Sequence, residues 1–109
     1  MPNKENQYNA EGLMGRKMEK KISEEISLLR KKIDTIDEEI MNLLSERVLV
    51  SKKIGKIKRT HGEPIVDISR ENEIYDRIMD LAEKLEISPE DSKNVYQQII
   101  KMCRNAQKT

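Results

Sequence analysis

Arg47 and Lys58 are the strongest candidates for chemistry in this 109-residue chain. Arg47 interrupts a regular stripe of apolar residues, and Lys58 directly follows the last residue of that stripe. Apolar residues recur from position 22 to position 57 at spacings that alternate between four and three, and Arg47 takes the place of one of them. This spacing is typical of the buried seam of a helix. Burying an unpaired guanidinium there would cost several kcal/mol, and the stripe contains no acidic residue that could pair with it. We therefore expect Arg47 to meet either a carboxylate from another part of the protein or an anion from outside. The apolar members of the stripe are Ile22, Ile26, Leu29, Ile33, Ile36, Ile40, Leu43, Val50, Ile54 and Ile57.

Lys58 lies eleven residues after Arg47, which is three helical turns. The two side chains then point the same way to within about 20° and lie about 16 Å apart along the axis, so they could bracket a small anion. Arg30 is about 25 Å from Arg47 and rotated by about 100°, so it cannot reach the same small-molecule site within one chain. If two such helices pair across a two-fold axis, Arg30 of one subunit could reach the Arg47 site of the other.

Other candidate residues lie on the two helices that follow. Glu71 is in phase with Tyr75 and Ile78, which directs its carboxylate inward. Cys103 and Gln107 are one turn apart, next to the apolar face of the last helix. The set is rich in cations, with one carboxylate and one neutral amide, and suits a dianionic organic acid that also bears a hydroxyl.

Plainer interpretations remain open for the same residues. Arg47 could pair with a glutamate of another helix or set the register of a coiled coil. Lys58 and Arg30 could be solvated helix charges. Glu71 could form an ordinary surface pair with Arg70, and Cys103 could be a small buried hydrophobic residue.

Three helices, one long and two short, must position these side chains, so the fold class is all-α. We expect the first helix over residues 22–60, followed by a breaker cluster at residues 61–64. Asp67 is placed to cap a second helix that ends near residue 85, and residues 88–91 read as the start of a third. Residues 1–20 lack an apolar period, and we expect a disordered extension or an expression remnant there, with the domain at residues 21–109. The expected inward residues are Ile74, Ile78, Leu81 and Leu85 on the second helix and Val95, Ile99, Met102 and Ala106 on the third.

Composition excludes several function classes. Charged residues make up 38% of the chain but the net charge is +1, and only three tyrosines are available for stacking, which argues against a nucleic-acid partner. One cysteine and one histidine argue against a metal site, and no apolar run is long enough to span a membrane. The composition favours a soluble, cytoplasmic protein that needs no cofactor.

The length of the first helix predicts a partner chain. At 1.5 Å per residue it would span about 57 Å, whereas each of the other two helices reaches about 30 Å. Two short helices cannot cover the whole stripe of the long one. A homodimer in which the long helices pack together would bury the remainder.

The chain resembles the all-helical chorismate mutase family over residues 26–107. The resemblance implies an intertwined, domain-swapped dimer with two active sites, each lined by both chains. It is carried by a series of short motifs in order: Leu29-Arg30-Lys31-Lys32-Ile33-Asp34, Ile36-Asp37, Leu44-Ser45-Glu46-Arg47, Gly55-Lys56-Ile57-Lys58, Pro64-Ile65-Val66-Asp67, Arg70-Glu71 and Gln107.

The resemblance also implies roles for single residues. Arg47, with Arg30 from the partner chain, would hold the carboxylates of chorismate. Lys58 would contact the ether oxygen and a carboxylate, and Gln107 would contact the ether oxygen. Glu71 would accept from the ring hydroxyl, Asp67 and Arg70 would shape that end of the pocket, and Cys103 would stand where relatives often have serine.

Two other functions stay open at this point. An isochorismate-pyruvate lyase on the same scaffold would use a similar set of cations, although residues 64–71 look more like those of the mutases. A helical dimerisation module without enzymatic activity would need these charges only for solubility.

Overall fold

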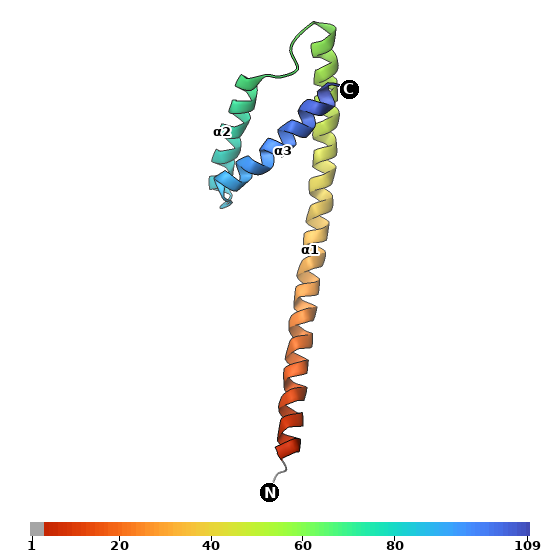
Figure 1. The fold of residues 1–109 in the computed structure, drawn as a ribbon, viewed down its shortest axis with the longest axis vertical. Helices are drawn as coiled ribbons and strands as arrows, with labels where there is room; N and C mark the ends of the chain where they lie inside the picture. The colour runs from red at the N-terminus through yellow and green to blue at the C-terminus, as the bar shows by residue number, and fades with distance from the viewer. Residues whose placement is uncertain (1–3) are drawn as a thin grey trace. The chain divides into compact units, whose positions relative to one another are not determined.

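The computed structural model describes the backbone of residues 4–109 and the side chains of residues 12 and 14–109. Within this part of the chain the fold is all-α, as predicted, and holds three helices and no strand (Figure 1). None of these helices is both long and apolar enough to cross a membrane. The chain divides into two compact units, residues 1–40 and residues 41–109. The helices are α1 (Lys4–Thr60), α2 (Ile68–Lys84) and α3 (Pro89–Gln107).

The first helix begins much earlier than the apolar pattern predicts. α1 starts at Lys4 and not near residue 22, so the expected absence of structure up to residue 20 is wrong from Lys4 onward, and residues 1–3 lie outside the described part. Residues 4–21 are rich in Lys, Glu, Met and other strong helix formers and contain no proline. The helix propensity of these residues therefore extends α1 toward the N-terminus, beyond Ile22, where the apolar period starts. The domain boundary at residue 21 stays a prediction.

Two helix ends close with the same backbone motif. After α1, Gly62 adopts a φ of 68°, and the N–H of Glu63 donates to the carbonyl of Lys58 at 2.8 Å. After α2, Glu86 adopts a φ of 58°, and the N–H of Ile87 donates to the carbonyl of Ala82 at 2.9 Å. Both ends are Schellman motifs, which satisfy carbonyls of the last turn. The predicted breaker cluster thus ends α1 as expected.

Both predicted N-caps are confirmed. The Asp67 side chain accepts from the N–H of Arg70 at 3.0 Å, and Ser88 Oγ accepts from the N–H of Asp91 at 3.2 Å. Pro89 follows in the first turn of α3. These caps fix where α2 and α3 start, and so set the phase of the side chains that follow.

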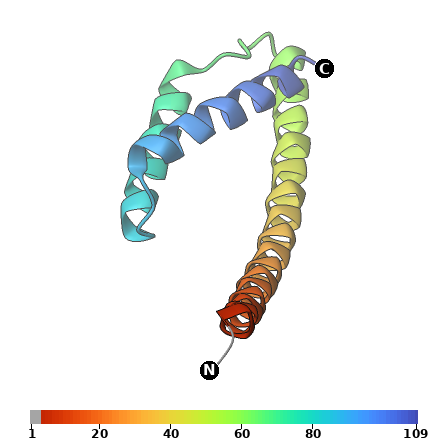
Figure 2. The ribbon, with the colours of Figure 1, turned by 60° about the horizontal axis from the view of Figure 1, so that its bottom comes forward.

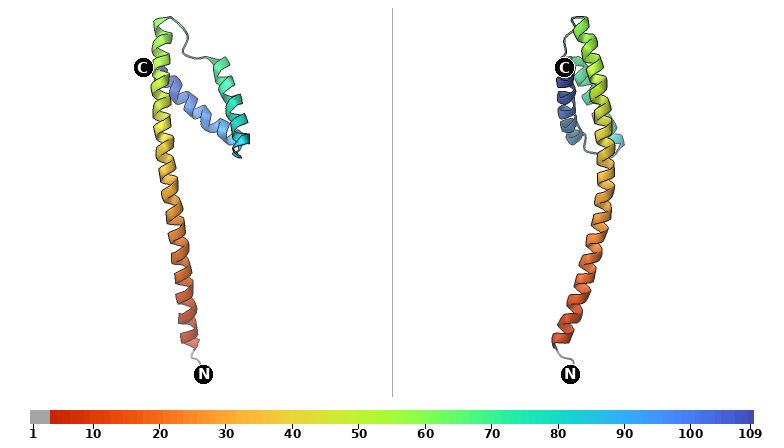
Figure 3. Two further views of the ribbon diagram at one scale, coloured as in Figure 1. Left: turned by 180° about the vertical axis from the view of Figure 1, so that it is seen from behind. Right: turned by 90° about the vertical axis from the view of Figure 1, so that its right-hand side faces the viewer.

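α2 and α3 pack together through a small apolar core. Ile74, Ile78 and Ile100 are buried at its centre, with Tyr75 and Tyr96 packed against it. Figures 2 and 3 show α3 running from its junction with α2 back to the C-terminal part of α1.

The buried face of α3 is rotated from the predicted one. Of the residues expected inward, Ala106 is buried and Ile99 is half-buried, but Val95 and Met102 are 58% and 49% exposed, and Ile100 and Cys103 are buried in their place. Of the residues expected inward on α2, Leu81 and Leu85 are also exposed. The sequence of α3 carries two adjacent apolar stripes, and packing against α2 selects the one that contains Ile100.

The apolar stripe of α1 is uncovered in the single chain. Each of its ten apolar members, from Ile22 to Ile57, is between 42% and 64% exposed. Arg47 differs from its neighbours in the stripe because it is half-buried. A continuous apolar surface of this length is typical of an interface.

Candidate active site

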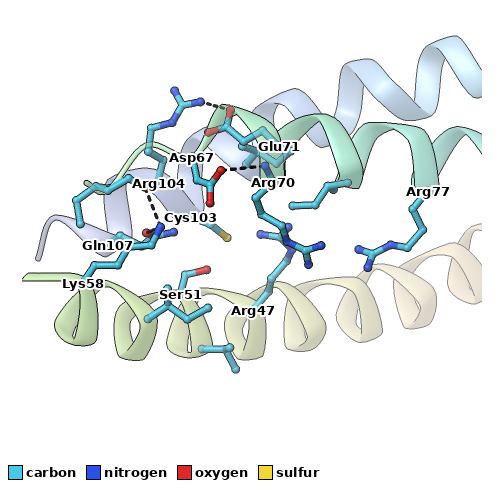
Figure 4. Close-up of a pocket in the computed structure, with 15 residues that line it drawn as sticks. Arg47, Ser51, Lys58, Asp67, Arg70, Glu71, Arg77, Cys103, Arg104 and Gln107 are labelled. Atoms are coloured by element: carbon cyan, nitrogen blue, oxygen red, sulfur yellow. Dashed lines mark hydrogen bonds and ion pairs between the residues drawn. The ribbon is translucent and has the colours of Figure 1, made fainter. Parts of the chain in front are cut away.

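A cavity of about 280 Å³ lies between the C-terminal part of α1 and the helices α2 and α3 (Figure 4). This volume is near the lower end of the range for small-molecule sites. Arg30 is not among the lining residues and lies in the N-terminal unit. The other seven residues expected at the site line the cavity together: Arg47, Lys58, Asp67, Arg70, Glu71, Cys103 and Gln107.

Lys58 and Gln107 are hydrogen-bonded to each other at one end of the cavity. Lys58 Nζ donates to Gln107 Oε1 at 3.1 Å and to the carbonyl of Ile65 at 3.0 Å. An ammonium group has three protons to donate, so one remains for a ligand. Because a lysine can only donate, the amide oxygen of Gln107 must face it, and the amide N–H groups then point elsewhere. The pair therefore offers donors of both residues to a ligand oxygen.

Gly55 allows α3 to approach α1 closely enough for this pair to form. A Cβ at position 55 would lie 2.5 Å from Gln107 Cα and 2.8 Å from its carbonyl carbon. Arg59 on the next turn donates to the carbonyl oxygen of Gln107. The glycine and the arginine together fix the end of α3 against α1 and place Gln107 beside Lys58.

The lining of the cavity carries a clear excess of positive charge. Its ionisable groups other than the cysteine are five cations and two carboxylates, a surplus of three positive charges. Among the described side chains, neither Arg47 nor Arg77 has a salt bridge. Such an excess in a confined space favours an anionic ligand.

Glu71 pairs with an arginine that the sequence analysis did not single out. Its Oε1 accepts from Arg104 of α3, and the two side chains are 17% and 32% exposed. Arg70 instead pairs with Glu73 at 3.3 Å, in an exposed contact along α2. The alternative pairing of Arg70 with Glu71 therefore does not form. Glu71 Oε1 is occupied by Arg104, and its second oxygen makes no hydrogen bond to any described side chain.

Asp67 and Cys103 have structural roles that are visible directly. The Asp67 carboxylate caps α2 through the N–H of Arg70 while lining the cavity. Cys103 is 3% exposed and carries a free thiol, as expected of a small buried residue. Among the described side chains, no cluster of three His, Cys, Asp or Glu residues could hold a metal ion.

Three polar lining residues escaped the sequence analysis: Ser51, Arg77 and Arg104. Ser51 lies one turn after Arg47 and two turns before Lys58, so its helical phase could have identified it. Arg104 directly follows Cys103 and lies one turn before Lys108, in a stretch where charged residues are common. Its charge therefore did not distinguish it from its neighbours. Arg77 is an exposed helix residue whose sequence context carries no signal.

Comparisons with known proteins identify the family of this chain. The family model for chorismate mutase type II matches residues 29–108. The chain is 36% identical to a chorismate mutase of Methanocaldococcus jannaschii, over 78% of this chain and 86% of that protein. It is 40% identical to a bifunctional chorismate mutase/prephenate dehydratase of Aquifex aeolicus, over 78% of this chain but only 24% of that much longer protein. A solved structure of a conserved hypothetical protein from Pyrococcus furiosus superimposes with a TM-score of 0.59 at 32% identity, covering 75% of this chain and 93% of that one. The chain belongs to the chorismate mutase type II family.

Proposed function

We propose that this protein is a chorismate mutase that rearranges chorismate to prephenate in the cytoplasm, on the route to phenylalanine and tyrosine. Membership of the family and the similarity to named chorismate mutases support the activity. The observation that carries it is the Lys58–Gln107 pair, which holds two hydrogen-bond donors side by side in a cationic cavity. The buried free thiol of Cys103 is compatible with a reducing compartment.

The chemistry needs only positioning and charge stabilisation. The rearrangement is intramolecular: the ether C–O bond breaks while a new C–C bond forms, and no proton is added or removed. An enzyme accelerates it by holding the compact, chair-like conformer and by stabilising negative charge that develops on the ether oxygen. Arg47 would hold a carboxylate, and the third proton of Lys58 and the amide of Gln107 would meet the ether oxygen. Glu71, steadied by Arg104, would accept from the ring hydroxyl through its second oxygen.

The proposal includes a homodimer that is intertwined, with the long helices exchanged between the two sites. The exposed stripe of α1 supports it, because an apolar face of this length is unstable in water unless another chain covers it. Arg30 would then contribute to the partner's cavity, as the second ligand of the substrate carboxylates. Arg70 and Asp67 would shape the hydroxyl end of the site, and Cys103 would lie beside a substrate carboxylate.

The test of the activity is the conversion of chorismate to prephenate by the purified protein. Arg47→Ala and Lys58→Ala should each lower kcat/KM by at least about 100-fold, because each removes a charge from a site that works by electrostatic stabilisation. Folded variants with near wild-type activity would refute the assignment. Formation of pyruvate and salicylate from isochorismate would instead identify a lyase. Absence of both reactions, and of saturable binding by a bicyclic dicarboxylate analogue of the transition state, would favour a dimerisation module.

Mixing two inactive variants tests the shared site. Arg30→Ala and Arg47→Ala subunits each damage both sites of their own homodimer. A heterodimer of the two contains one site with both arginines and one with neither. An equal mixture that exchanges freely should recover about a quarter of the wild-type activity, since half of the dimers are mixed and each has one intact site. No recovery after demonstrated subunit exchange would refute sharing across chains.

The catalytic domain is proposed to cover residues 21–109. The family match, which starts at residue 29, supports this boundary. Deleting residues 1–20 should leave kcat and KM unchanged, because the cavity residues that the structure describes all lie between Arg47 and Gln107. A large loss of activity in the shortened protein would contradict the boundary.

A further inference from the structure

Ser51 is a buried polar residue in the wall of the cavity. It is 6% exposed, although it lies on a helix whose surrounding residues are mostly exposed. It follows Arg47 by four residues and precedes Lys58 by seven. These spacings place it on the same face of α1 as both cations, between them along the axis.

The hydroxyl of Ser51 has no hydrogen-bond partner among the described residues. Two other hydroxyls on α1, those of Thr35 and Thr60, donate to the carbonyl four residues earlier at 3.2 Å and 2.8 Å, whereas Ser51 makes no such bond. The Ser51 oxygen is also accessible. Among the described side chains, Arg104 Nε is the only fully buried nitrogen or oxygen without a hydrogen-bond partner, so the unpartnered Ser51 Oγ is not fully buried. The hydroxyl therefore opens onto the cavity, and Figure 4 shows it directed away from α1 toward the space between the helices.

We propose that Ser51 is a substrate-binding residue whose hydroxyl donates a hydrogen bond to the carboxylate that Arg47 holds. This inference rests on the proposed function and adds a contact to the same site. A hydroxyl can donate or accept, but the positive lining brings an anion to this place, and an anion can only accept. The ether end of the substrate already has its donors in Lys58 and Gln107. Of the two substrate carboxylates, the one held by Arg47 is the nearer to Ser51 along α1, because Arg47 lies one turn away.

The proposal predicts a defect in binding and not in chemistry. The substrate carboxylate carries its charge both before and during the rearrangement, so the hydrogen bond acts equally on ground state and transition state. Ser51→Ala should raise KM for chorismate about tenfold, as expected for a hydrogen bond to a charged group, and leave kcat within about twofold of wild type. The inhibition constant of a bicyclic dicarboxylate transition-state analogue should rise by the same factor.

Matched variants separate the hydroxyl from the shape of the side chain. Ser45→Ala makes the same change on an exposed position of α1 outside the cavity and should behave as wild type. Ser51→Thr keeps the hydroxyl, and Ser51→Val has the same shape without it, so the threonine variant should bind the analogue more tightly than the valine variant.

The outcomes distinguish this inference from the proposed function. An active wild type and a folded Ser51→Ala variant with unchanged KM would overturn the inference alone, since Ser51 would then only fill space. A fall in kcat with unchanged KM would also overturn it, because the hydroxyl would then act on the transition state. A wild type without mutase activity would overturn the proposed function and the inference together.

Discussion

Replacing Gly55 by alanine should damage catalysis through backbone position alone. Gly55 is buried on α1, and its missing side chain leaves the space into which the end of α3 fits. An added Cβ would lie 2.5 Å from Gln107 Cα and 2.8 Å from its carbonyl carbon. These are backbone atoms, which cannot turn aside as the tip of a flexible side chain can. The last turn of α3 must therefore move as a unit.

The required movement follows from the contact distances. Ordinary contact starts at 3.4 Å, so Gln107 must retreat by roughly 0.9 Å. A retreat of this size lengthens the Lys58–Gln107 hydrogen bond from 3.1 Å to about 4 Å, which breaks it. A misplacement of about 1 Å can cost about 100-fold in rate, and we expect kcat to fall by about that factor. KM should change less, because Arg47 stays in place.

The variant should remain folded. Alanine gains about 1 kcal/mol over glycine in a helix, which offsets part of an overpacking cost of about 1–3 kcal/mol. Steady-state kinetics with chorismate, together with urea denaturation, measure both effects. Gly15→Ala is the matched control, because it makes the same change on α1 with nothing within 4 Å of the new Cβ, and its kinetics should not change. A folded Gly55→Ala protein with kcat within about threefold of wild type would show that Gln107 needs no such placement.

Three further predictions concern an ion pair, a helix end and the interface. Arg104→Leu leaves the half-buried carboxylate of Glu71 without its partner and should lower kcat/KM about tenfold in steady-state assays. Arg104→Lys keeps the positive charge and should recover most of the loss, whereas equal defects in both variants would argue against a role for the charge. Glu86→Gly removes a side chain from a backbone with positive φ and should raise the free energy of unfolding by about 1 kcal/mol in urea titrations with activity unchanged, whereas a decrease would contradict the strain. Ile33→Asp puts a charge into the exposed stripe and should shift the sedimentation coefficient from that of a dimer to that of a monomer, with loss of activity. A wild-type protein that sediments as a monomer would contradict the proposed interface.

Much of the fold was readable because helix boundaries depend on local chemistry. The caps at Asp67 and Ser88 and the breaker at Gly62 act within a few residues, and all three were predicted correctly. The start of α1 was missed because propensity alone carries the helix through residues 4–21, where no apolar period marks it. The buried face of α3 was predicted only at Ala106, because two stripes compete there and packing of Ile100 against α2 decides between them.

The candidate site was predictable as a list of residues but not as a set of contacts. Helical phase brought out five of the seven expected residues that line the cavity, and the family resemblance added Asp67 and Arg70. The sequence did not reveal that Glu71 is held by Arg104, because the two are 33 positions apart and on different helices. It also could not explain Gly55, whose value lies entirely in the approach of Gln107. Such contacts depend on how helices cross, which local patterns do not encode.

The position of Arg47 explains why assembly and catalysis would share one helix. Leu43 and Val50, its neighbours in the stripe, are 64% and 53% exposed in the single chain, whereas Arg47 is half-buried and lines the cavity. In the proposed dimer a second chain covers the stripe and therefore comes close to the cavity at this point. Excluding water there strengthens the attraction between Arg47 and a substrate carboxylate, because the local dielectric constant falls. An arginine in an apolar stripe weakens a purely structural interface, but in this place the interface itself makes the charge effective.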